Sequence, residues 1–483
     1  MSNLASLSAT EASQRINRGN LTAEEYVWSF IERIERLEPK LHSFITFNRE
    51  NALADAHRID QKIRSGQEVG PLAGITVGIK DNISTNGLKT TCASKMLENY
   101  IPPFNATVVE RLKKNGAIVI GKLNMDEFGM GSSTEYSMYG ATHNPWNTDY
   151  VPGGSSGGSG AAVSSCECCA SLGSDTGGSI RCPASFCSVV GLKPTYGRVS
   201  RFGLVSYANS LEQIGPICRT VEDVVLIMNT IAGKDQRDDT SLLAPDIPSL
   251  QINPNARVTS IAIVKDLMEG SDPAVSKTIY DALDKFQDIG IKISEISLKS
   301  VNYALPSYYT LATAEASSNL ARYDNIRYGF SFPSEGYEWN TYISKVRSHF
   351  GEEVKRRILI GSYVLSSGYY GKYYLKARQL RSLLRCELLS NLKKYDLLAG
   401  PTMPILPFKI GEKVEDPLKM YLMDVDTVIA NLGGIPAISV PAGYSDNLPI
   451  GLQLMAGPFQ EQKLVDATFI FQNAKKLSMR APV

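Results

Sequence analysis

Apolar residues recur at helical spacing in the first part of the chain. After a capping box at residues 22–25, four of them fall on one face of a helix: Tyr26, Phe30, Ile34 and Leu37. A similar box at residues 8–11 marks a second helix start. We therefore predict helices over residues 1–65, including an amphipathic surface helix.

The pattern changes after residue 74. Ile75, Val77 and Ile79 alternate with other residues and end at Lys80, as in a strand. Other short apolar runs occupy residues 117–120, 261–264, 397–399, 437–440 and 452–455. Because such runs alternate with helical stretches, we predict an α/β fold with a largely buried sheet.

No repeat or low-complexity linker interrupts residues 70–230. The polar, proline-bearing stretch at 234–260 is a candidate boundary, but strands are predicted on both sides of it. We therefore predict one domain over residues 1–483. Its parts are N-terminal helices (1–65), a core (about 70–230), and a variable middle and C-terminal part (235–483).

Composition narrows the function classes. The 483 residues include 50 Lys plus Arg and 49 Asp plus Glu, a net charge of +1, so a nucleic acid would be held mainly by a partner. The N-terminus shows no basic region followed by an apolar run, and no run reaches the ~18 apolar residues of a membrane span. The eight cysteines are then expected to be reduced thiols of a cytoplasmic protein, or of an organellar matrix if the source is eukaryotic.

Metal and histidine chemistry find little support in the sequence. The four histidines form no His-Glu-x-x-His pattern and offer no clear base for a Ser-His-Asp hydrolase. The run Cys166-Glu-Cys-Cys169, with Cys182 and Cys187, raises the alternative of a metal site, but it lacks standard zinc spacing. We expect no metal, and buried thiols in a helix or strand.

Two serine-glycine segments carry the candidate chemistry. They are Pro-Gly-Gly-Ser-Ser-Gly-Gly-Ser-Gly at residues 152–160 and Gly-Ser-Asp-Thr-Gly-Gly-Ser-Ile-Arg at 173–181. A flexible linker and a phosphate loop are alternatives for the first, although no Gly-Lys-Ser/Thr follows it. In the second, glycines allow backbone N–H groups to converge near a serine hydroxyl, as in an oxyanion hole.

A nucleophilic serine needs a base, and lysine follows histidine as a candidate. Lys80 closes an apolar strand and precedes Asp81 and Asn82. A buried lysine can lose its charge and then accept a proton. The alternative, which holds for most lysines, is a solvated surface charge.

These segments resemble the amidase-signature family. Its Gly-Gly-Ser-Ser-Gly-Gly loop matches residues 153–158, its Gly-Ser-Asp-x-Gly-Gly-Ser-Ile-Arg segment matches 173–181, and its lysine matches Lys80. The resemblance implies a large mixed central sheet covered by helices on both faces. It also implies a Ser-Ser-Lys triad in which Ser179 attacks an amide and Ser155 passes the proton to Lys80. The oxyanion would be held by the N–H groups of Thr176, Gly177, Gly178 and Ser179.

Further segments resemble the A subunits of glutamyl-tRNA(Gln), or aspartyl/glutamyl-tRNA, amidotransferases. They are residues 80–82, 90–94, 122–128, 191–204, 213–216, 356–358, 366–370 and 431–434. In that family glutamine is hydrolysed, and the resemblance places its carboxylate on Arg357 and its ammonium on Asp424, with Gly131 and Tyr308 completing the pocket. The alternative for Arg357 is a surface helix charge, because it ends the run Glu352-Glu-Val-Lys-Arg-Arg.

The same resemblance implies the partners. Ammonia would pass to the B and C subunits of a heterotrimer, where ATP and magnesium activate mischarged Glu-tRNA(Gln), held mainly by the B subunit. This chain itself would bind no cofactor. The alternatives are a stand-alone amidase and a non-catalytic scaffold.

The chain departs from the family pattern at three places. Cys182 stands where glutamine is usual, Ser188 replaces a glycine, and Cys166-Glu-Cys-Cys169 replaces small apolar residues. The first departure bears on the support of the oxyanion loop.

Overall fold

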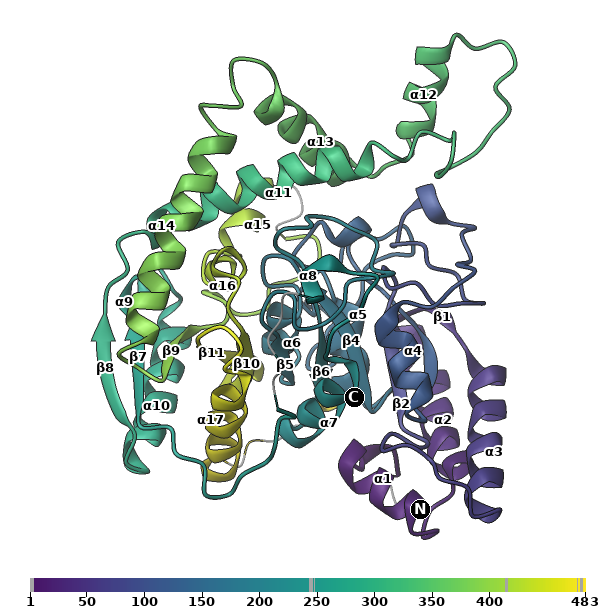
Figure 1. Cartoon of the computed structure of the whole chain (residues 1–483), viewed down its shortest axis with the longest axis vertical. Coiled ribbons are helices and arrows are strands. Elements are labelled where there is room, and N and C mark those ends of the chain that lie inside the picture. Colours follow the sequence, from purple (N-terminus) through teal and green to yellow (C-terminus); the bar gives the residue numbers. More distant parts are fainter. Residues whose placement is uncertain (1–3, 243–245, 247, 413–415, 476, 478–480) are drawn as a thin grey trace.

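A computed structural model describes residues 4–242, 246, 248–412, 416–475, 477 and 481–483, and its centre is an eleven-stranded sheet (Figure 1). The strands are β1 (Phe44–Phe47), β2 (Thr76–Lys80), β3 (Ile118–Leu123), β4 (Ala170–Asp175), β5 (Val190–Lys193), β6 (Gln213–Cys218), β7 (Ser260–Val264), β8 (Lys292–Ile296), β9 (Leu397–Pro401), β10 (Ala437–Ser445) and β11 (Leu448–Met455). Their order across the sheet is β1-β3-β2-β4-β6-β5-β10-β11-β9-β7-β8.

Helices fill most of the remaining chain. The α-helices are α1 (Ala9–Asn17), α2 (Ala23–Leu41), α3 (Arg49–Arg64), α4 (Thr107–Lys114), α5 (Gly157–Ser164), α6 (Arg181–Phe186), α7 (Val221–Ile231), α8 (Asp239–Leu242), α9 (Lys265–Met268), α10 (Pro273–Asp288), α11 (Ala304–Leu320), α12 (Trp339–Arg347), α13 (Glu352–Leu365), α14 (Tyr374–Leu392), α15 (Pro417–Leu422), α16 (Val428–Gly433) and α17 (Glu461–Ala474). Short 3₁₀ helices are η1 (Leu4–Ser6), η2 (Lys95–Leu97), η3 (Glu127–Gly129) and η4 (Val301–Tyr303). None of the helices described here is long and apolar enough to cross a bilayer.

The sheet mixes parallel and antiparallel pairs. Strand β2 lies parallel to both β3 and β4, and β7 lies parallel to both β8 and β9. The central strands β6, β5, β10 and β11 pair antiparallel. This confirms the predicted fold class, an α/β protein with a large mixed sheet. The one sheet takes strands from both the predicted core and the later part of the chain.

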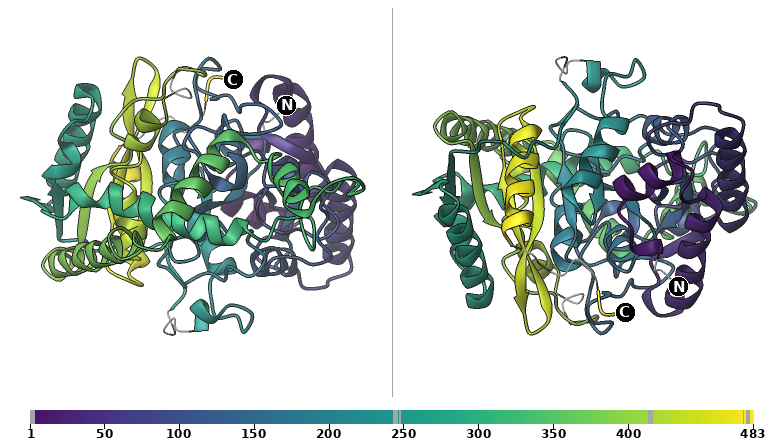
Figure 2. Two further views of the ribbon diagram at one scale, coloured as in Figure 1. Left: turned by 90° about the horizontal axis from the view of Figure 1, so that it is seen from above. Right: turned by 90° about the horizontal axis from the view of Figure 1, so that it is seen from below.

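Both faces of the sheet are buried away from its edge strands β1 and β8, which explains the continuous apolar runs in the sequence. In β7, Ile261 and Ile263 enter the core beneath α1, α4, α7, α10 and α17, whereas Ala262 and Val264 enter the core beneath α11, α14 and α16. Alternate side chains of a strand point to opposite faces, so two apolar cores require apolar residues at every position. Seen from above, α10 and α14 lie on opposite sides of the sheet (Figure 2).

Helices α11 and α13 run across one end of the sheet, above the strand ends that carry the candidate chemistry (Figure 1). They pack against each other and, through α11, against α14 and α16. This layer covers those strand ends from one side, so side chains of α11 and α13 can reach the candidate catalytic residues.

The structure corrects two expectations about the first part of the chain. Strand β1 interrupts the predicted run of helices and joins the edge of the sheet at β3. The box at residues 22–25 is complete, with Thr22 and Glu25 capping each other. The box at Ser8 is half formed, because the Glu11 carboxylate pairs with Arg15.

The cysteine-rich stretch was also predicted wrongly in part. Residues 166–169 form a turn between α5 and β4, neither helix nor strand, although all three cysteines are buried as expected. The candidate boundary at 234–260 falls partly on residues 243–245 and 247, which lie outside the described residues.

The complete capping box gives a stability prediction. Thr22→Ala removes the side-chain oxygen that accepts from the Glu25 N–H, so we expect a loss of about 1 kcal/mol in unfolding free energy. Urea unfolding followed by circular dichroism measures it. Thr22→Ser retains the hydroxyl and should stay close to wild type; equal stability of all three proteins would contradict the capping role.

Candidate active site

Lys80 ends β2 with its amine fully buried in the molecule. Its Nζ lies 2.8 Å from Ser155 Oγ, 2.9 Å from Ser174 Oγ and 3.3 Å from the Ser174 carbonyl oxygen. Asn82 Nδ2 donates to the same Ser174 hydroxyl at 3.0 Å. The structure therefore brings two of the three predicted triad residues into direct contact and excludes the solvated alternative for Lys80.

Burial sets the charge of this amine. It lowers the pKa of Lys80 to about 7, because desolvation penalises the ammonium form more than the nearby carboxylates of Asp126 and Asp175 favour it. A substantial fraction of Lys80 is then neutral near pH 7. In that form the nitrogen has a lone pair that can accept the Ser155 proton while its hydrogens remain bonded to Ser174.

Ser155 sits in a closely packed loop before α5, and its peptide bond to Gly154 is cis. The loop is held by Thr134, whose hydroxyl donates to the Gly153 carbonyl and accepts from the Gly157 N–H, both at 2.9 Å. A side chain at Gly154 would overlap the carboxylate of Asp126. The glycine-serine run is thus an ordered, buried segment, which excludes the flexible linker.

The carboxylate of Asp175 fixes the turn that carries Ser179. It accepts from the N–H groups of Gly178 (2.9 Å) and Ile180 (3.2 Å). Arg181 donates to it through Nε at 3.0 Å and Nη2 at 2.9 Å, and both side chains are fully buried. Burial alone would raise the pKa of Asp175, but the Arg181 guanidinium outweighs it and lowers that pKa to about 2. The carboxylate therefore stays ionised and holds the turn.

Arg181 also connects the nucleophile turn to the late part of the chain through hydrogen bonds. Its Nη1 donates to the Thr427 carbonyl at 2.9 Å and to Gln453 in β11, and its Nη2 donates to Asn431 at 2.6 Å. Asn431 in turn donates to Asp175 at 2.9 Å. Segments some 250 residues apart in sequence are locked around one buried guanidinium.

The turn of residues 176–179 has the backbone freedom that its glycines predict. Gly178 has φ +138°, and a Cβ there would overlap Thr427, while a Cβ on Gly177 would overlap the Tyr308 ring. The structure pairs the Gly178 N–H with Asp175. Within the described chain, the N–H groups of Thr176, Gly177 and Ser179 have no protein partner, so three of the four predicted donors are free in this conformation.

Asp424 lies beside this turn, on the side of α15 and α16. Its carboxylate accepts from the Ser132 hydroxyl at 2.8 Å and from the Tyr309 hydroxyl at 2.7 Å. Burial raises the pKa of Asp424 to about 6, against the opposing effect of both hydroxyls and of Arg357. Above that pH the group is a buried anion suited to a cationic ligand.

Arg357 is not a surface charge, which overturns the alternative. It is 3% exposed on the inner side of α13, where Nε donates to Glu353 and Nη1 to the Tyr207 hydroxyl, each at 2.7 Å. Three aromatic rings surround the guanidinium, with centroids 5.3–5.7 Å from Cζ: Tyr207, Tyr309 and Tyr421. Of its donors, Nη2 has no partner in the described structure.

The two remaining predicted pocket residues are placed by their neighbours. The Tyr308 ring covers Gly177 of the nucleophile turn, and it packs edge-on against Tyr309 at 4.9 Å. Gly131 lies against the Asp126 carboxylate, which accepts from the N–H groups of Thr134 and Tyr136 and so shapes the loop. Both therefore border the same polar centre as the triad.

Sequence reasoning gave no role to several residues that build this centre. They are Ser132, Ser174, Asp175, Tyr207, Tyr309, Glu353, Tyr421 and Asn431. Ser174 and Asp175 fall inside the segment 173–181, so that motif held the signal. The tyrosines and Glu353 carry no local signal, because only the packing of α11, α13, α15 and the segment before β6 brings them together.

Cys182 fills space beside the nucleophile turn. Its thiol lies 3.6 Å from the Ser132 carbonyl, and a side chain at Gly153 would press on its sulfur. Burial raises the pKa of the Cys182 thiol well above its usual range, so it is uncharged. Within the described residues, no group of three or more His, Cys, Asp or Glu side chains is placed to hold a metal ion.

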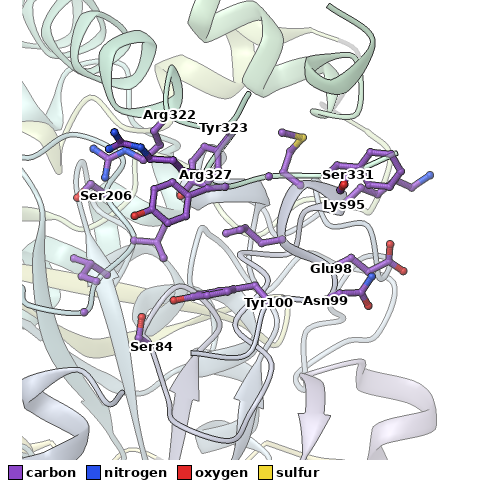
Figure 3. Close-up of a pocket in the computed structure, with 18 of the residues that line it drawn as sticks. Ser84, Lys95, Glu98, Asn99, Tyr100, Ser206, Arg322, Tyr323, Arg327 and Ser331 are labelled. Atoms are coloured by element: carbon purple, nitrogen blue, oxygen red, sulfur yellow. The ribbon is translucent and has the colours of Figure 1, made fainter. Parts of the chain in front are cut away.

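A cavity of about 650 Å³ lies apart from the triad, between η2, residues 203–206 and residues 322–331 (Figure 3). Tyr100 and Ser84 line one side, opposite Arg322 and Tyr323. Lys80, Ser155 and Ser179 are not among its lining residues. Tyr323 of this cavity packs on Phe128 of η3, with ring centroids 5.2 Å apart.

Comparison with known proteins identifies relatives of this architecture. The sequence model of the Amidase family matches residues 25–465. The A subunit of glutamyl-tRNA(Gln) amidotransferase from Sulfolobus acidocaldarius is 50% identical over 474 residues, covering 96% of this chain and 97% of the relative. The corresponding protein of Carboxydothermus hydrogenoformans is 49% identical, covering 99% of each chain.

Solved structures give the same picture. The A subunit of glutamyl-tRNA(Gln) amidotransferase from Thermotoga maritima superposes with a TM-score of 0.80 at 40% identity, covering 96% of this chain and 93% of that one. The peptide amidase of Stenotrophomonas maltophilia gives a TM-score of 0.81 at 26% identity, covering 99% of each. One fold thus serves both a peptide amidase and a component of a tRNA amidotransferase.

The lowered pKa of Lys80 predicts how serine reactivity depends on pH. Only the neutral amine can accept a proton, so labelling of Ser179 by a fluorophosphonate should fall about ten-fold per pH unit below a pKa of about 7 and level off above it. Mass spectrometry of the labelled peptide between about pH 5.5 and pH 8.5 measures the rate. Lys80→Met should label slowly at every pH. A flat wild-type profile would contradict Lys80 as the base.

Proposed function

The chain belongs to the amidase family, and from that premise we propose that it is the glutaminase component of a tRNA-dependent amidotransferase. The observation that carries the proposal is the contact of a buried Lys80 with Ser155. A buried guanidinium and a buried carboxylate, those of Arg357 and Asp424, support it, because both contact Tyr309. Glutamine presents the complementary carboxylate and ammonium groups.

The first chemical step uses Lys80, Ser155 and Ser179. The Ser179 Oγ attacks the side-chain amide carbon of glutamine, its proton passes to Ser155, and the Ser155 proton passes to the neutral Lys80 amine. Ser155 can relay because its hydroxyl both donates and accepts. General acid–base transfer of this kind contributes about 10²–10⁴-fold in rate.

The developing oxyanion needs donors that are in place before the reaction. The unpaired N–H groups of Thr176, Gly177 and Ser179 supply them, on a turn held by Asp175 and Arg181. Proton return through Ser155 releases ammonia and leaves an acyl-enzyme on Ser179. Water, activated by the same relay, then releases glutamate.

Recognition of free glutamine follows from the charges of the pocket. The unpartnered Nη2 edge of Arg357 can donate to the α-carboxylate, and its aromatic surroundings keep the guanidinium in one orientation. The Asp424 carboxylate, fixed by Ser132 and Tyr309, balances the α-ammonium group. Buried opposite charges favour a zwitterion over a neutral amide.

The ammonia would be used by a partner. We place ATP and magnesium there, with B and C subunits completing a heterotrimer, and this chain holding no cofactor of its own. The acceptor is mischarged Glu-tRNA(Gln), and Asp-tRNA(Asn) is a second candidate. The net charge of +1 supports a tRNA held mainly by the B subunit.

Reconstitution tests the proposal as a whole. The chain, its partner subunits, ATP, magnesium, glutamine and Glu-tRNA(Gln) should yield Gln-tRNA(Gln), and Ser179→Ala should reduce the glutamine-dependent rate at least about 10³-fold, because the nucleophile is lost. Free ammonia should restore product with Ser179→Ala, since it bypasses the glutaminase. Ammonia release from simple amides without any tRNA product would instead indicate a stand-alone amidase.

The pocket assignment has a separate test. Asp424→Asn removes the charge that balances the substrate ammonium, so we expect the KM for glutamine to rise about 10–100-fold, the effect of losing one charge-assisted hydrogen bond. Hydrolysis of propionamide, which has no ammonium, should change little. Steady-state kinetics on both amides measures the difference.

Asp426 provides a matched control. It is buried two residues away, and burial raises the pKa of its carboxyl well above the usual range. Asp426→Asn should leave the glutamine KM unchanged. Equal loss on both amides in Asp424→Asn would argue against the pocket.

A further inference from the structure

The outward side of α13 and the turn that follows it expose a group of large apolar side chains. We call this the α13 patch, and it consists of Leu359, Ile360, Tyr363, Tyr369, Tyr370 and Tyr373. Leu359 is 71% exposed and Tyr363 is 49% exposed. Contiguous exposed apolar surface of this kind marks interaction sites on soluble proteins.

The tyrosines of the patch form an ordered surface. The rings of Tyr363 and Tyr369 lie 4.4 Å apart, and Tyr373 lies 5.9–6.0 Å from both. Tyrosine rings that already pack on one another lose little conformational freedom when a partner covers them. The surface is therefore already organised for contact.

The charged side chains of the turn after α13 and of the first part of α14 have one sign. Lys372, Lys376 and Arg378 are exposed beside it, and residues 366–386 include no Asp or Glu. Among the described residues none of these three cations has a salt bridge, and Lys372 instead lies 5.8 Å from the Tyr369 ring centroid. A partner surface should therefore carry carboxylates at its rim.

The patch lies on the back of the glutamine pocket. Arg357 faces inward from α13 at 3% exposure, and Leu359, two residues later, faces outward. The turn between α13 and α14 projects from the top of the molecule, clear of the sheet (Figure 1). A molecule bound to this face would touch the helix that positions Arg357.

We propose that the α13 patch is the docking surface for the ammonia-accepting protein subunit, which meets it with an apolar centre and an acidic rim. This rests on the proposed function, which requires a partner close to the site where ammonia forms. Aromatic anchors within an apolar centre are typical of the energetic core of protein interfaces.

Two other occupants fit the surface less well. RNA would use the tyrosines and cations, but Leu359 and Ile360 offer no ring for a base to stack on, and the tyrosines already stack on one another. A second copy of the chain in a symmetric contact would bring Lys372, Lys376 and Arg378 against the same cations. A protein with carboxylates satisfies both the apolar and the charged features.

The test measures binding of the full chain to the purified partner subunits by titration calorimetry. Leu359→Ser combined with Tyr363→Ser should raise the Kd at least about 30-fold, as expected for loss of a central aromatic anchor. In a parallel surface plasmon resonance experiment, Lys376→Glu combined with Arg378→Glu should slow association about ten-fold at low salt and much less at about 0.5 M salt. Hydrolysis of propionamide by each free variant should match wild type, which shows that the fold is intact.

Tyr280→Ser on α10 is the matched control, because Tyr280 is 42% exposed and lies on the opposite side of the sheet. It should leave the Kd unchanged.

If wild type binds and the patch variants bind equally well, the docking surface is wrong while the proposed function stands. If wild type does not bind the subunits, the proposed function fails and the docking proposal with it. Patch variants that still bind the subunits but no longer bind tRNA would assign the patch to RNA and overturn the proposal. Patch variants that lose only self-association would assign it to a second copy of the chain and also overturn it.

Discussion

The buried ion pair between Asp175 and Arg181 is the interaction on which the active centre depends. It joins the end of β4, the nucleophile turn, α16 and β11 in one hydrogen-bonded cluster. Burying two charges is costly, and such a pair adds little net stability, but removing one partner typically costs ~3–5 kcal/mol. The pair therefore serves to specify one arrangement of the turn, with its N–H groups set before any substrate arrives.

Burial acts in opposite ways on the titratable groups around this centre. Among the described residues, the Lys80 amine has only neutral oxygens within hydrogen-bond distance, and desolvation brings its pKa down to about 7. Asp175 is equally buried, but it contacts the Arg181 guanidinium and therefore stays ionised. The difference lies in the contacts and not in the degree of burial, so one core holds a base and a fixed anion side by side.

Helix α13 and Cys182 show how other side chains are arranged around the active centre. Helix α13 presents Arg357 to the pocket and an apolar face to the exterior, so it can link the inside of the molecule to its surface. The Cys182 thiol packs between Gly153 and the Ser132 carbonyl. The Cys182 backbone N–H donates to the Gly178 carbonyl at 2.7 Å, and the side-chain hydrogen bonds to the turn come from Asp175, which Arg181 and Asn431 hold in place.

The sequence alone determined the fold class, most of the strands in the later chain, and the segments that bear Lys80, Ser155 and Ser179. It could do so because strand periodicity and glycine-rich turns are local properties of the chain. Only the tertiary structure decided that Lys80 and Arg357 are buried from solvent and that residues 166–169 form a turn. Tyr207, Tyr309 and Tyr421 likewise gather around Arg357 from three distant segments. Burial and long-range contact depend on what packs against a residue, and no local pattern records that.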